Sequence, residues 1–123
     1  MGFGIATSAC PCGATSYDEH CGPLHRGERQ AATPEELMRS RFSAYAVGDS
    51  DYVWRTWHPR TRPEQVQPDP SIQWRRLEIV EAVDDVVEFR AHFEGPTGPG
   101  VQHERSLFQQ RAGRWFYVEP QLG

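Results

Sequence analysis

The apolar residues of this chain change their spacing once, near residue 72. Before that point they recur every three or four positions between residues 33 and 48, which predicts an amphipathic helix. Thr33, Pro34 and Glu36 match a capping box with proline at the first helical position. Gly48 is the expected helix stop. A first helix of about fourteen residues is therefore predicted.

A second, shorter helix is predicted after it, capped by Asp49 or Ser50 and ending before Pro59. Residues 59–71 contain four prolines and are expected to form a loop. Four later segments alternate apolar and polar side chains as strands do: residues 72–83, 86–93, 101–110 and 114–119. Short turns join them, the longest predicted at 95–100. Two helices followed by such a meander predict an α+β fold with helices on one face of an antiparallel sheet.

The first 32 residues follow neither pattern. They hold all three cysteines and two of the five histidines, with almost no apolar periodicity. A segment this short cannot bury a core and needs a covalent or metal cross-link. We therefore expect two units, residues 1–32 and residues 33–123. The first six residues lack the charged and apolar regions of a signal peptide, and position 6 is not the Ser or Thr of a myristoylation motif.

Composition excludes several functions. The net charge of −4 divides evenly, with four Arg and six acids in residues 1–50 and nine Arg and eleven acids beyond, so no basic half exists to follow a nucleic-acid backbone. Lysine is absent, which removes Schiff-base and P-loop lysine chemistry. No apolar run approaches the length of a membrane span. The expected location is the cytoplasm.

The cysteines suggest a metal site. Cys10 and Cys12 are followed by His20 and Cys21, which together offer four soft donors for tetrahedral zinc. An odd number of cysteines fits a disulfide scheme poorly, although free or redox-active thiols remain an alternative. Four protein ligands leave no open coordination position, so the zinc would be structural. His25 is a competing fourth ligand.

These residues lie in a longer pattern. Residues 10–13 (Cys-Pro-Cys-Gly), Tyr17 and residues 20–25 (His-Cys-Gly-Pro-Leu-His) resemble the SEC-C zinc motif, named for the SecA C-terminus. Residues 37–45, 56–59, 104–108 and 113–118 resemble the bacterial YchJ family. The resemblance implies an N-terminal zinc knuckle and a nuclear transport factor 2-like (cystatin-like) cone, but no reaction. Two departures stand out: the family usually has Cys-Cys where this chain has His20-Cys21, and no second SEC-C motif follows the cone.

A cone of this type encloses a pocket. An enzyme would use His58 as general base, with Glu104 orienting it or Arg105 stabilising an anion. Glu104 and Arg105 are adjacent strand positions, so only one of them points inward. The favoured interpretation is structural: both join Arg41 in a partly buried ion network, and Trp57 and His58 pack at a helix end.

Three functions follow from these features. The first is a zinc-stabilised binding or adaptor protein, with the knuckle on a protein partner and the cone either supporting the knuckle or holding a small-molecule ligand. The second is a small enzyme that uses His58 for proton transfer or hydrolysis. The third is a nucleic-acid contact through the knuckle, Arg26 and Arg29. The absence of a catalytic motif favours binding over catalysis, and both a monomer and a homodimer fit the sequence.

Overall fold

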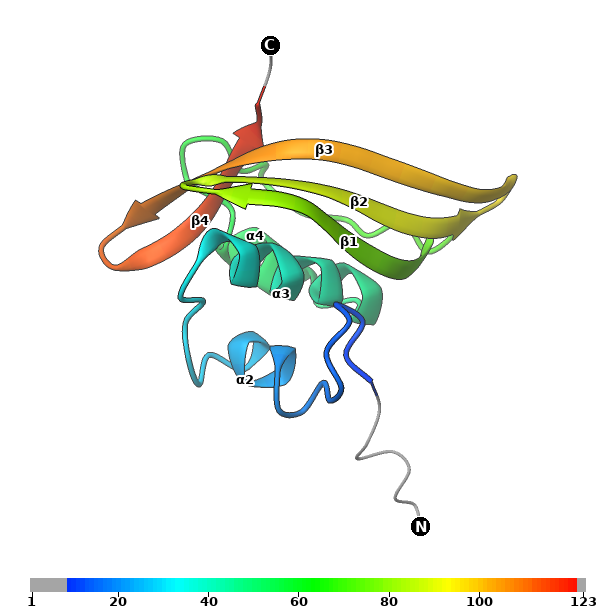
Figure 1. Ribbon diagram of the computed structural model, residues 1–123, viewed down its shortest axis with the longest axis horizontal. Helices are drawn as coiled ribbons and strands as arrows, with labels where there is room; N and C mark the ends of the chain where they lie inside the picture. The colour runs from blue at the N-terminus through cyan, green and yellow to red at the C-terminus, as the bar shows by residue number, and fades with distance from the viewer. Residues whose placement is uncertain (1–8, 122–123) are drawn as a thin grey trace.

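Four antiparallel strands form one curved sheet, and the helices lie on one side of it (Figure 1). The computed structural model describes residues 9–121. The strands pair in chain order: β1 (Gln73–Val83), β2 (Val86–Gly95), β3 (Gly98–Arg111) and β4 (Arg114–Pro120). This arrangement confirms the predicted α+β meander. The expectations about a signal peptide and myristoylation concern residues outside the described range.

The main helix, α3 (Pro34–Val47), begins and ends where its sequence signals predict. The Thr33 hydroxyl accepts a hydrogen bond from the Glu36 backbone N–H at 3.1 Å. The Glu36 carboxylate accepts from the Ala32 backbone N–H (2.7 Å), one residue earlier than in a standard capping box. Gly48 adopts a left-handed φ of +84°, which ends the helix at little cost because glycine has no Cβ.

Removing the N-cap tests this assignment. Thr33→Ala is expected to lower the free energy of unfolding by about 1 kcal/mol, because the Glu36 N–H loses its acceptor. Chemical denaturation measures the change. The control is Thr97→Ala in the exposed β2–β3 turn, which should shift stability by less than about 0.5 kcal/mol. Equal effects in the two variants would contradict the capping role.

Helix α3 is covered on both sides, which its pattern alone did not predict. Met38 and Phe42 belong to the core formed with the sheet. Ser40 and Ser43 are also fully buried, because the N-terminal segment and α2 (Cys21–His25) lie against the helix on the side away from the sheet (Figure 1). No apolar periodicity in the sequence predicted α2. The buried faces of α3 carry the polar residues Ser40, Arg41 and Ser43 beside its apolar ones, so its apolar periodicity is weaker than that of a helix with one purely apolar face.

The short helix α4 (Ser50–Arg55) follows α3 directly. Of the two predicted caps, Asp49 performs the role, because its carboxylate accepts from the Tyr52 backbone N–H at 3.1 Å. In residues 9–121 no helix is both long and apolar enough to cross a membrane.

The strands place their apolar side chains as predicted. Val87, Phe89 and Ala91 alternate along β2 and are buried toward the helices. The turn predicted at 95–100 is shorter, because Gly95 already pairs with Gly98. Gly100 lies opposite Phe93, whose ring packs so closely that a Cβ at position 100 would lie 2.5 Å from it. Strand pairing therefore continues into the glycine-rich segment, although its glycines and prolines had predicted a turn there.

Candidate metal centre

Four side chains converge in the N-terminal segment. The Sγ atoms of Cys10, Cys12 and Cys21 and the Nδ1 atom of His20 all lie within 4.8 Å of one another. His20 Nδ1 is 3.3 Å from Cys12 Sγ, 3.2 Å from Cys21 Sγ and 4.0 Å from Cys10 Sγ. The three cysteines are buried free thiols. The fold therefore brings four soft donor atoms, three sulfurs and one imidazole nitrogen, close to one point.

The donor set fits a tetrahedral zinc ion. Zinc bonds of about 2.3 Å to sulfur and about 2.0 Å to nitrogen place sulfurs about 3.8 Å apart and sulfur and nitrogen about 3.6 Å apart. The Cys12–Cys21 sulfurs are 3.7 Å apart, and the three distances to His20 bracket the second value. Thiolates and imidazole are also the ligands that zinc prefers. Small adjustments would be enough for all four atoms to coordinate one ion.

Two tight turns hold the ligands in place. The Gly13 N–H donates to the Cys10 carbonyl (3.0 Å), and Gly13 has a φ of +110° that side chains rarely adopt. The Gly22 N–H donates to the Tyr17 carbonyl at 2.7 Å, and a Cβ on Gly22 would lie 2.9 Å from the same oxygen. Each pair of candidate ligands, Cys10 with Cys12 and His20 with Cys21, is thus followed by a glycine that the chain path requires.

Ser43 of α3 adds a contact that the motif did not reveal. Its hydroxyl lies 3.3 Å from Cys10 Sγ, and both groups are buried. Hydrogen bonds from Cys12 and Cys21, and then from Ser43, lower the pKa of the Cys10 thiol. Hydrogen bonds with Cys10 and Cys12 raise the pKa of the Cys21 thiol. Ser43 is therefore placed to stabilise negative charge on a cysteine sulfur. In the sequence Ser43 is only one residue of the helical segment 37–45, and no pattern there singles it out.

His25 does not join the four donors. Its Nε2 lies 2.8 Å from the Ser40 carbonyl, which only accepts, so this nitrogen carries the proton. Its Nδ1 then accepts from the Tyr17 hydroxyl at 2.6 Å. With both ring nitrogens bonded and 6% of its surface exposed, His25 connects α2 to α3.

Further contacts attach this segment to the helices. Arg39 of α3 donates to the Cys12 carbonyl at 2.9 Å, and Arg55 of α4 donates to the His25 carbonyl at 2.5 Å. Leu24 and Ala31 belong to the same apolar core as α3 and the sheet. The segment that carries the cysteines is therefore packed onto the rest of the molecule through Arg39, Arg55, His25 and Leu24.

The candidate catalytic residues of the cone are not brought together. A cavity between α3 and the sheet contains Glu104, but His58 does not line it. His58 is 8% exposed, its ring packs edge-on against Phe116, and its Nδ1 accepts from the Arg60 backbone N–H at 3.0 Å. Its own backbone N–H donates to the Tyr117 carbonyl. The arrangement of His58 oriented by Glu104 is therefore not found.

The buried position of His58 makes stability depend on pH. Burial, and then the positive charge of Arg60, lowers its pKa. As pH falls below the ordinary value of about 6.5, the unfolded chain takes up this proton first, so stability is lost in acid. His58→Asn keeps an acceptor for Arg60 and should lose less stability than wild type between pH 8 and pH 5 in denaturation experiments. Gln67→Asn, which changes an exposed and uncharged side chain, should retain the wild-type slope.

The predicted ion network of Arg41, Glu104 and Arg105 is wrong. Successive side chains of β3 alternate in direction, so Glu104 lies with the cavity while Arg105 is on the outer face. There Arg105 pairs with Glu81 and Glu88, each at 2.9 Å. The prediction that only one of the two neighbours points inward is confirmed.

Comparisons with known proteins identify the family. Residues 33–120 match the family model described as YchJ, middle NTF2-like domain. A UPF0225 protein of Deinococcus radiodurans is 50% identical over 112 residues, covering 89% of this chain and 86% of the relative. A second UPF0225 protein, from Streptomyces coelicolor, is 44% identical, covering 94% and 96%. The chain belongs to the YchJ (UPF0225) family.

Solved structures agree with this placement in the YchJ family. A SEC-C motif containing protein from Rhodopseudomonas palustris has a TM-score of 0.83 and 34% identity, covering 94% of this chain and 99% of that one. A second, from Psychrobacter arcticus, has a TM-score of 0.78 and 26% identity, covering 96% and 84%. The expected nuclear transport factor 2-like fold is confirmed, and the cysteine–histidine cluster with these SEC-C neighbours indicates a metal-binding module.

Proposed function

We propose that this YchJ-family protein is a zinc-stabilised binding module. The observation that supports it most is the convergence of Cys10, Cys12, His20 and Cys21, whose four donor atoms lie within 4.8 Å. These residues would hold one zinc ion, and no fifth position would be left for a substrate. Bound zinc would supply a permanent cross-link between the two halves of the motif, with no catalytic role.

The same ion would also fix the knuckle, residues 9–32, to the cone. Cys10 contacts Ser43, and Arg39 holds the carbonyl of Cys12, so two of the proposed ligands connect directly to α3. Because a short segment has little core of its own, metal binding and local folding are expected to be one event. The ion would then determine whether the knuckle covers the side of α3 that faces away from the sheet.

Binding is favoured over catalysis by the positions of the candidate residues. His58 is hydrogen-bonded and packed at the end of α4, apart from the cavity that contains Glu104. General base catalysis needs the base within hydrogen-bond reach of its substrate. The cavity, by contrast, is lined by apolar side chains with a few polar groups, as small-ligand sites are.

A protein is the partner proposed for the knuckle. The two arginines that a nucleic acid would require are already paired: Arg26 with Glu28 at 2.7 Å and Arg29 with Glu36 at 2.8 Å. Neutralised arginines release fewer counterions on binding phosphates. An exposed surface with both signs of charge suits a polar protein interface better. We place the protein in the cytoplasm, where its three thiols stay reduced.

Metal analysis and affinity capture test this function together. Purified protein should contain one zinc per chain, and Cys10→Ser with Cys12→Ser should remove it. Partners captured quantitatively by immobilised wild-type protein should be lost with this double variant. Ser16→Ala, in the same segment but outside the cluster, is the control and should keep both. Retention of the partners by the zinc-free variant would overturn the knuckle interface, and absence of zinc from wild type would overturn the metal site.

A further inference from the structure

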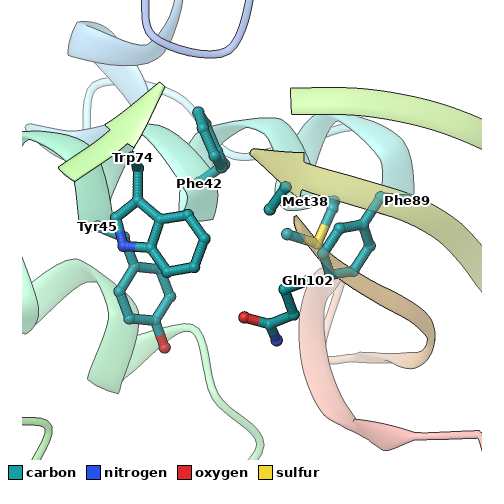
Figure 2. Close-up of a pocket in the computed structure, with 7 residues that line it drawn as sticks. Met38, Phe42, Tyr45, Trp74, Phe89 and Gln102 are labelled. Carbon is teal, nitrogen blue, oxygen red and sulfur yellow. The ribbon is translucent and has the colours of Figure 1, made fainter. Parts of the chain in front are cut away.

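The cavity of the cone has two ends of different chemistry. Each end has a volume of about 170 Å³, and they share Met38, Tyr45, Phe89 and Gln102. Phe42, Trp74 and Ala91 complete the apolar end. Figure 2 shows Trp74 and Tyr45 on one side of the open space and Met38 and Phe89 on the other, with the polar ends of Tyr45 and Gln102 both in the lower part of the view. An apolar cavity of roughly 150 Å³ is already large enough for benzene.

The polar end contains a buried cation that no carboxylate of the described residues contacts. Arg41 is 3% exposed, and no carboxylate within residues 9–121 lies within 4 Å of its guanidinium nitrogens. Its Nη1 donates to the Val53 carbonyl and to Thr56 Oγ1, each at 2.8 Å. Its Nε and Nη2 make no hydrogen bond with the described residues. A buried charge is expensive unless it is paired, so this guanidinium has unused capacity for an anion.

A second unused donor lies beside it. Trp57 Nε1 is the one buried side-chain nitrogen or oxygen in residues 9–121 that has no hydrogen-bond partner. Trp57 lines the same polar end, and the Arg41 guanidinium lies 5.2 Å from the centre of its ring. Buried polar groups in native proteins are nearly always satisfied. Two donors without acceptors at one end of a cavity call for a ligand that brings acceptors.

The acceptor in the cavity is already occupied. Glu104 Oε2 accepts from the Ser106 hydroxyl at 2.6 Å and from the Tyr117 hydroxyl at 3.0 Å. Burial, and then the Glu104 charge, raises the pKa of Tyr117, so its hydroxyl remains a donor. Glu104 Oε1 faces the Gln102 amide at 3.4 Å. No nitrogen of Arg41 lies within 4 Å of this carboxylate, so Glu104 makes no direct ion pair with Arg41, and its negative charge opposes a doubly charged ligand more strongly than a singly charged one.

We propose that the cone binds a small monocarboxylic acid with an apolar body. The carboxylate would accept from Arg41 and Trp57, and the body would lie between Phe42, Trp74 and Phe89. One negative charge provides the direct ion pair that Arg41 lacks, and a doubly charged phosphate ester is disfavoured by Glu104. This inference rests on the proposed function, because it names the ligand class of the binding module.

Three probes of similar size test the ligand class. Phenylacetate, phenylacetamide and phenyl phosphate are titrated into the zinc-loaded full chain, with binding measured by calorimetry and by tryptophan fluorescence. Phenylacetate should bind at least about tenfold more tightly than either other probe, because only it satisfies the guanidinium with a single charge. Equal binding of acid and amide, tighter binding of phenyl phosphate, or no phenylacetate binding at millimolar concentration would overturn the proposal.

Two substitutions locate the site. Trp57→Phe keeps an aromatic ring but removes the unpaired N–H, and should weaken phenylacetate binding about fivefold or more while the chain stays folded. Trp54→Phe is the matched control, because the Trp54 indole donates to the Pro63 carbonyl away from the cavity. Arg41→Gln should abolish the preference for acid over amide. Unchanged phenylacetate binding in both Trp57→Phe and Arg41→Gln would overturn the assignment.

Zinc content is measured on each sample. Failure of phenylacetate to bind a chain that holds one zinc would overturn the cone proposal alone. Absence of zinc in a chain that still binds phenylacetate would overturn the metal site alone. The two proposals therefore fail separately.

Discussion

His20→Ala is expected to weaken zinc binding by about 100-fold, whereas His25→Ala should keep one zinc per chain. Structural zinc sites of four ligands bind with about 10–16 kcal/mol, so one ligand contributes roughly a quarter of that at most. His25 instead bonds Tyr17 and Ser40 and lies in the packed layer between α2 and α3. Its loss should lower the free energy of unfolding by about 2–4 kcal/mol without changing the metal content.

Chelator competition measures the affinity, and mass spectrometry of the intact protein measures the stoichiometry. His20→Cys supplies the conservative variant, because a thiolate there restores four soft donors and matches the Cys-Cys pair that is usual in the family. It should recover near wild-type zinc content. If His25→Ala lost the metal while His20→Ala kept it, the assignment of ligands would be reversed.

Arg41→Gln is expected to lower the free energy of unfolding by about 3 kcal/mol. The guanidinium holds the Val53 carbonyl and the Thr56 hydroxyl at the end of α4, and it lies 5.2 Å and 4.6 Å from the ring centres of Trp57 and Tyr117. Glutamine cannot reach both acceptors and carries no charge for the rings, so a buried carbonyl is left without a donor.

Arg105→Gln is the matched control. Arg105 makes two ion pairs on the outer face of the sheet, where its side chain is 38% exposed and water screens the charges. Its loss should cost less than about 1 kcal/mol. Chemical denaturation of both variants at one pH compares them directly. A larger effect for Arg105 would contradict the structural assignment of the two arginines.

The elements of this fold could be predicted because their signals are local. The Thr33 cap, the Gly48 stop and the alternation of Val87, Phe89 and Ala91 each depend on near neighbours in the chain. α2 lacked such a signal, since its residues are held by contacts with α3 rather than by their own periodicity. The turn at 95–100 was predicted too long, because its glycines serve strand pairing and the Phe93 ring.

The metal-ligand candidates were also visible in the chain, because four soft donors occur close together in it. The sequence alone did not decide whether His20 or His25 is the fourth ligand candidate. The choice depends on Tyr17 and Ser40, which satisfy both nitrogens of His25 only after α2 packs on α3. The role of Ser43 likewise exists only because Cys10 is brought 3.3 Å from it across 33 positions.

By itself, then, the sequence determined the α+β class, the boundaries of α3 and the set of metal-ligand candidates, since caps, periodicity and soft-donor spacing act over a few residues. The tertiary structure alone decided which arginine is buried, because β3 alternation sends Arg105 to solvent while α3 leaves Arg41 facing the cavity. It also separated His58 from Glu104 and left Trp57 Nε1 beside Arg41 without a partner. These relations join residues far apart in the chain, and only packing brings them together.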